Sequence, residues 1–199
     1  MRILLLAIVW FGMLPVRAQT AEIRWSPSRV LRVSDFAIVK AGRPRPPSLG
    51  RNMAVTRTGF VYSITRGSGT GKGTVMIRIY AQMDPAHSFI LEKVIKGDAA
   101  DRAYLFNHEQ KHFDISEIYA RELSRFLRTQ SRGNPTMDHI TKEANRLFTE
   151  LNAFQKKYDA ATNNGRNKAM QAHWNAIIAQ RLKALESYAA KDYMLSGYR

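Results

Sequence analysis

The feature that most constrains this chain is an apolar stripe in residues 100–130, where the side chains recur every three or four positions. That spacing predicts one long amphipathic helix with a buried face. Two histidines lie within the stripe, whose members are Leu105, His108, His112, Ile115, Tyr119, Leu123 and Phe126. Because positions four apart share a helical face, both imidazoles point the same way, toward the edge of a core.

The two histidines belong to the segment His108-Glu109-Gln110-Lys111-His112, which has the form H-E-x-x-H. In this motif two helical histidines bind zinc and the glutamate is the general base of a metalloprotease. Glu109 is offset by about 100° from His108, so it flanks the metal and can take a proton from a bound water. Burying two unpaired imidazoles would be costly, which favours a bound metal. We predict zinc on His108 and His112 with Glu109 catalytic; the alternative is two hydrogen-bonded histidines that hold no metal.

The N-terminus has the pattern of a secretory signal peptide. Arg2 precedes an apolar run over residues 3–16, and Val16-Arg17-Ala18 places small residues before a cut. The apolar run is too short for a convincing transmembrane helix. We predict a signal peptide over residues 1–18, cleaved after Ala18, and one domain over residues 19–199. The expected location is secreted or periplasmic in a bacterium, with no transmembrane anchor after cleavage.

The chain contains no cysteine. Disulfides, a thiolate nucleophile and a cysteine-ligated zinc site are therefore excluded, and stability must come from a packed core. A chain of this length is long enough to bury such a core in one domain. Export without disulfides fits a bacterial envelope better than an animal extracellular space.

The charge is strongly basic, because Lys and Arg total 31 against 16 Asp and Glu. Loss of Arg2 and Arg17 with the signal peptide lowers the formal net charge from +15 to +13. Such a field suggests an anionic envelope polymer as a neighbour, for example lipid headgroups or cell-wall polymers. Nucleic acid is not expected as a partner of an exported protein. The alternative is that the charge only keeps the protein soluble.

Strands are predicted in the first half of the domain. Residues 22–25 and 30–33 alternate in polarity, which predicts two short edge strands. Three prolines and four basic residues in 40–51 predict an exposed loop. Residues 54–65 and 74–83 are rich in β-branched and aromatic side chains, which predicts a β-hairpin.

The hairpin tip, residues 67–73, is rich in glycine but departs from the phosphate-binding loop motif at Arg66 and Gly73. No nucleotide site is expected there. Beyond the hairpin, residues 86–99 indicate a packed connection to the motif-bearing helix.

Two further helices are predicted over residues 136–158 and 168–190, where apolar side chains again recur every three or four positions. Asn163-Asn164-Gly165 separates them. With strands first and helices second, we predict an α+β fold: a small antiparallel sheet with the hairpin, followed by three long helices.

The chain resembles a known family in several separate segments. They are His108 to Arg121, Ser34-Asp35-Phe36 and Tyr158-Asp159-Ala160-Ala161-Thr162, followed by Gln171 and Trp174. This pattern is similar to a bacterial family of secreted zinc-dependent proteases, domain of unknown function 922. The resemblance implies a zincin-like fold with the H-E-x-x-H helix at the core edge and a metallopeptidase activity.

The third metal ligand is open at this point, since the family pattern has a histidine where this chain has Asn164. A catalytic zinc normally takes three protein ligands and leaves a fourth position for water. Asp159, a hard oxygen ligand in the same segment, is the first choice. The alternatives are Glu143, Glu150, His139 and His173.

The leading hypothesis is a zinc metallopeptidase that hydrolyses a peptide or protein substrate through a zinc-bound water, with Glu109 as general base. Residues 74–83 are expected to pair with an extended substrate at a sheet edge. Tyr158 is a candidate oxyanion donor. The alternatives are a catalytically impaired zincin-like binding module of the envelope, or a hydrolase of cell-wall amide bonds.

Overall fold

The computed structural model describes residues 22–66, 74–130 and 135–195. The proposed signal peptide and the glycine-rich hairpin tip lie outside these residues. The described chain is a mixed α+β structure with two small sheets and several helices. None of its helices is long and apolar enough to cross a membrane.

The first sheet is antiparallel and centres on β5 (Val75–Met83). β5 pairs along its whole length with β4 (Thr58–Arg66), which confirms the predicted hairpin. On its other side it pairs with β1 (Ile23–Arg24) and with β7 (Asp192–Leu195). Because β5 has neighbours on both sides, the expectation that residues 74–83 offer an edge to substrate is wrong.

The second sheet is small and was not expected. β6 (Phe89–Leu91) pairs in parallel with β2 (Ala37–Val39) and antiparallel with β3 (Ala54–Val55). The strand predicted over residues 54–65 is therefore divided, its first two residues belonging to this sheet. The expected single antiparallel sheet is thus replaced by two sheets, one of them mixed.

The strand expected over residues 30–33 is also wrong, since a 3-10 helix, η1 (Val33–Asp35), begins there. The cause is local. The Asp35 carboxylate accepts hydrogen bonds from the Arg32 backbone N–H at 2.8 Å and from the Arg29 guanidinium at 2.6 Å. These bonds close a turn that an extended strand would break. The loop predicted over residues 40–51 contains no helix or strand, as expected.

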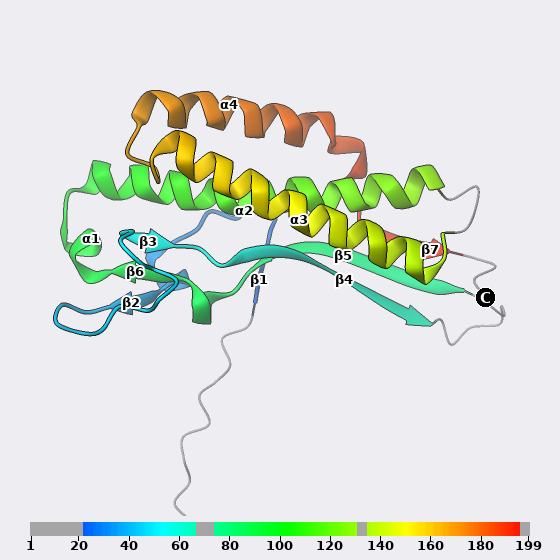
Figure 1. Ribbon diagram of the computed structural model, residues 1–199, viewed down its shortest axis with the longest axis horizontal. Helices are drawn as coiled ribbons and strands as arrows, with labels where there is room; N and C mark the ends of the chain where they lie inside the picture. Colours follow the sequence, from blue (N-terminus) through cyan, green and yellow to red (C-terminus); the bar gives the residue numbers. More distant parts are fainter. Residues whose placement is uncertain (1–21, 67–73, 131–134, 196–199) are drawn as a thin grey trace, which may run out of the picture.

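The helices follow the sequence pattern closely. α1 (Glu92–Lys96) is short, and α2 (Ala99–Gln130), α3 (Met137–Thr162) and α4 (Lys168–Ala184) are long. The helix predicted over 168–190 ends earlier, because η3 (Glu186–Tyr188) and β7 follow it. Figure 1 shows the three long helices gathered on one side of the strands, with α2 packed on β4 and β5 and α4 farthest from the sheet.

The core lies between α2 and the first sheet. Ile115, Ile118 and Leu123 of α2 are fully buried with Ile77 and Met83 of β5. β5 alternates between buried and more exposed positions, so one face of the sheet packs on α2. This packing fixes α2 along its length and thereby fixes the direction of the side chains at residues 108–112.

Candidate metal centre

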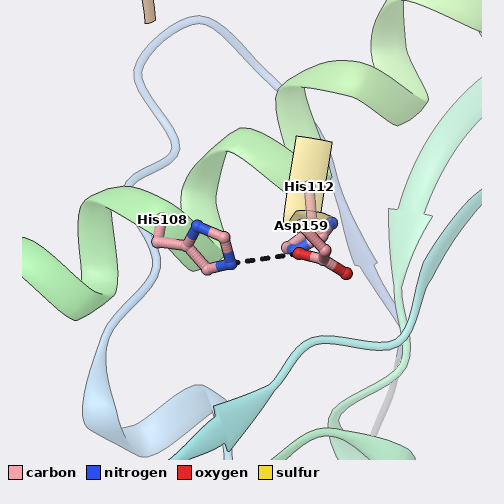
Figure 2. Close-up of side chains that lie close together, drawn as sticks. All are labelled: His108, His112 and Asp159. Atoms are coloured by element: carbon pink, nitrogen blue, oxygen red, sulfur yellow. Dashed lines mark ion pairs between the residues drawn. The ribbon is translucent and has the colours of Figure 1, made fainter. Parts of the chain in front are cut away.

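Two histidines of α2 and one aspartate of α3 converge beside the core. His108, Glu109 and His112 are 3%, 3% and 7% exposed, so the motif is buried. Figure 2 shows both imidazoles projecting from α2 toward Asp159. Asp159 Oδ1 lies 3.2 Å from His108 Nε2 and 2.9 Å from His112 Nε2. In the described part of the chain, these three residues are the group whose ligand atoms lie close enough to hold one metal ion, within 4.8 Å of one another.

Hydrogen bonds to the far side of each ring decide which nitrogen faces the centre. His108 Nδ1 lies 3.0 Å from Gln171 Oε1, and His112 Nδ1 lies 3.1 Å from Gln155 Oε1. Gln171 Nε2 donates to Tyr158 Oη at 2.6 Å and to Asn175 Oδ1 at 2.8 Å, which leaves its oxygen for His108. Each imidazole therefore donates from Nδ1, and each Nε2 carries a lone pair toward Asp159.

Three electron-rich atoms thus meet at one point. Asp159 Oδ1 is buried and accepts no hydrogen bond of regular geometry, although both Nε2 atoms are near. Two lone pairs facing a carboxylate oxygen repel it unless a cation lies between them. A divalent metal ion satisfies all three atoms at once, so the donor set fits a metal.

Without a metal, a proton can take part of that role. Burial disfavours the charged form of His112, but Asp159 and Glu109 outweigh it and raise the pKa of His112 above its ordinary value. Burial likewise favours the neutral form of Asp159, yet His108 and His112 hold its pKa far below the usual range. The centre therefore favours an ionised Asp159 carboxylate beside a positive charge. That charge is either the protonated imidazole of His112 or a metal ion.

Glu109 lies next to these atoms but is held by a different element. The hydroxyl of Thr56, between β3 and β4, donates to Glu109 Oε2 at 2.5 Å, and Thr56 is itself buried. This contact leaves the second carboxylate oxygen of Glu109 for another partner. Glu109 also lines the hollow beside the centre.

A hollow of about 530 Å³ opens at the centre and is lined by His108, Glu109, His112 and Asp159. Its other walls come from residues 52–56, from α1 and the start of α2, and from the turn after α3. Asn164 and Gly165 of that turn have φ of +50° and +77°, which bends the chain back toward His108. A fourth ligand and a substrate could both enter from this hollow.

Tyr158 does not have the geometry expected of an oxyanion donor. Its side chain is fully buried, stacks on the His108 ring at 4.7 Å, and donates its hydroxyl hydrogen to the His108 carbonyl at 3.3 Å. Burial, the largest influence, raises the pKa of Tyr158 well above the ordinary value. Tyr158 therefore packs against His108 and holds its ring in place. The hydroxyl hydrogen of Tyr158 is already used in the bond to the His108 carbonyl.

The other candidates for the third ligand lie elsewhere. Glu143 and Glu150 both pair with Arg146 on α3. His139 and His173 are exposed on α3 and α4. Of the five candidates named from the sequence, Asp159 alone joins the two histidines.

Residues 99–167 match a family described as bacterial protein of unknown function, DUF922. The match covers 69 of the 199 residues, about a third of the chain. No curated protein and no solved structure matches the chain. The DUF922 match spans α2, α3 and the turn after α3, and so contains His108, Glu109, His112 and Asp159.

Three residues that shape the centre were not assigned these roles by the sequence analysis. Thr56 and Gln155 lie 53 and 43 positions from the side chains that they contact. Gln171 belonged to the DUF922-like pattern, but its contact with His108 spans 63 positions. No local spacing signals such contacts.

Proposed function

We propose that this protein is a zinc-dependent peptidase with a zincin-like centre, in which His108, His112 and Asp159 hold the metal and Glu109 is the general base. The observation that supports it best is the convergence of two Nε2 atoms and one carboxylate oxygen beside a second, non-ligating carboxylate. Two histidines, one carboxylate and an open position form a donor set that catalytic zinc uses.

In this proposal some residues orient the metal ligands and others transfer the proton. Gln171 and Gln155 orient the two imidazoles, and carboxamide oxygens at Nδ1 keep each Nε2 free to bind a metal. Glu109, steadied by Thr56, accepts a proton from the attacking water and passes it to the leaving amine. Zinc, when bound, supplies Lewis-acid activation of the water and of the scissile carbonyl.

The substrate of this proposal is a peptide or protein met outside the cytoplasm, after removal of residues 1–18. We expect the substrate to pair with β3 in place of residues 74–83, since residues 52–56 line the hollow and β3 is one of the two outer strands of its sheet in the described part of the chain. Attraction to an anionic envelope polymer remains a prediction from the charge.

Metal analysis and a Glu109→Gln variant test the proposal together. The purified protein should bind about one zinc ion, and His108→Ala and His112→Ala should lose it. Glu109→Gln should keep the zinc but hydrolyse a labelled unfolded protein at least about a hundredfold more slowly. His139→Ala and His173→Ala, at exposed histidines, are the matched controls. Absence of bound zinc in the reconstituted parent would refute the proposal, and zinc without hydrolysis would support a binding module instead.

A further inference from the structure

A second hollow of about 620 Å³ adjoins the metal centre and shares Val55, Thr56 and Gln155 with the first. Two of the shared residues contact the centre directly. Thr56 donates to Glu109, and Gln155 accepts from His112. The two hollows therefore meet where the general base and the second histidine are held.

Two parts of the chain pass through both hollows in a consistent order. Residues 52–54 line the first hollow, residues 55 and 56 line both, and residues 57–60 line the second. On α3 the order runs the same way: Asp159 lines the first, Gln155 lines both, and Phe148, Leu151 and Asn152 line the second. The two hollows are thus consecutive along residues 52–60 and α3, with the centre near their junction. The second hollow also extends past β4, where its walls are Glu22, Ser48, Gln82, Asp84 and His87.

The two hollows are bounded by outer strands. β3 ends the order β2-β6-β3, and β4 ends the order β1-β5-β4, so in the described part of the chain neither has a strand on its other side. An extended peptide of nine residues spans about 30 Å. Such a peptide is long enough to occupy both hollows, which meet beside the metal centre.

We infer that the substrate is a polypeptide that occupies both hollows, so that the bond cleaved lies inside the chain and away from its ends. This inference rests on the proposed function. An enzyme that removes terminal residues needs a wall or a charge that stops the substrate close to the reacting bond, whereas here one hollow continues into the other. Contacts in the second hollow also add binding energy remote from the bond, which accelerates cleavage of long substrates over short ones.

The first hollow contains the feature that could instead favour release of terminal residues. Lys93, Arg102, Arg166 and Lys168 line it and could receive a free carboxylate at a peptide end. Asp98 and Asp101 line it too and could receive a free amino group. Peptides with blocked ends distinguish cleavage inside the chain from release of terminal residues, because they carry no terminal charge.

Asn152 allows the second hollow to be filled without disturbing the core. It is exposed on α3 and lines the second hollow. Asn152→Trp should occupy the hollow with a large side chain that a helix tolerates. Ala153→Trp is the matched control, since Ala153 is exposed on the same helix and lines neither hollow.

The experiment uses the zinc-loaded protein, an unfolded protein substrate, and an eight-residue quenched fluorescent peptide acetylated and amidated at its ends. Mass spectrometry of the products should show cuts with at least three residues on each side. Asn152→Trp should lower kcat/KM for the blocked peptide at least tenfold with zinc affinity unchanged, while Ala153→Trp keeps the parent value.

Removal of only one or two residues from free ends would overturn the inference and leave the proposed function standing. Asn152→Trp as fast as the parent would overturn it as well. No cleavage of any substrate by the zinc-loaded parent would instead refute the proposed function, and this inference with it. Product mapping on the parent decides the question even if Asn152→Trp fails to fold.

Discussion

At the scale of single residues, Asp159 decides whether the centre has two protein ligands or three. Asp159→Ala removes the oxygen that lies within 3.2 Å of both Nε2 atoms. Zinc affinity should fall at least tenfold, which is about 1.4 kcal/mol, in competition against a chelator. Asp138→Ala, an exposed aspartate in the first turn of the same helix, should bind like the parent. Unchanged affinity in Asp159→Ala would remove it from the ligand set.

Asn164 provides the complementary test, because the DUF922-like pattern has a histidine at this position. Asn164 lines the hollow at the centre. If Asp159 is the third ligand, Asn164→His should change zinc affinity less than threefold in the same titration. Tightening by tenfold or more would show that the parent lacks a full set of three ligands.

The two shifted pKa values predict how the metal-free protein responds to pH. The pKa of His112 is raised from 6.5 in the folded state, so its stabilisation is complete below pH 6.5 and is lost as pH rises through the folded value. The pKa of Asp159 is lowered from 3.8, so its stabilisation is complete above pH 3.8 and is lost as pH falls below that value.

With a chelator present, the free energy of unfolding should therefore decline as pH rises above 6.5, and also as pH falls below 3.8. Urea denaturation of the parent and of Asp159→Asn measures this. The difference between the two proteins should shrink at both ends of the range. A difference that stays constant from pH 5 to 9 would contradict the coupling of His112 to Asp159.

At the scale of elements, the turn between α3 and α4 positions the first histidine. Gly165 has φ of +77°, and a Cβ on it would lie 3.0 Å from Cγ of His108. Gly165→Ala therefore adds both backbone strain and a collision with a metal ligand. Zinc affinity should fall together with stability, as followed by chelator competition and thermal unfolding.

Gly42→Ala is the control for that variant, because Gly42 has φ of +74° but its Cβ would meet nothing within 4 Å. It should cost about 1 kcal/mol of stability through strain alone and leave zinc affinity unchanged. Equal zinc affinity in Gly165→Ala and Gly42→Ala would show that the turn does not position His108.

The sequence predicted those elements whose signal is local. The helix expected over 100–130 is α2 (Ala99–Gln130), because a long apolar periodicity is carried by neighbouring residues. The second sheet and β7 were missed because they consist of strands of two to four residues that exist only by pairing with distant segments.

In the metal centre, too, the sequence predicted the residues that are close together in the chain and missed contacts between distant ones. His108, Glu109 and His112 lie within one turn of helix, so their spacing alone indicated a shared face. Asp159 was named through the family resemblance, since no local spacing connects α3 to α2. Thr56, which holds Glu109, comes from the far side of the hollow and carries no motif of its own.

At the scale of the whole molecule, the centre joins parts that are distant in the chain. His108 and His112 lie on α2 and Asp159 on α3, while Thr56 connects Glu109 to the segment between the two sheets. An ion bound to ligands from two helices binds the folded state and has no equivalent site in the unfolded chain. Zinc binding should therefore stabilise the entire domain.

At a free zinc concentration one hundred times Kd, the stabilisation should be about 2.7 kcal/mol, which raises Tm by roughly 5 to 11 °C for a chain of this size. Differential scanning calorimetry with and without a chelator measures the shift. His108→Ala and His112→Ala should lose it, whereas His139→Ala and His173→Ala should retain it, because those histidines are exposed and lie outside the ligand cluster. A shift of equal size in all four variants would mean that zinc binds elsewhere on the surface, and that α2 and α3 are held together by packing alone.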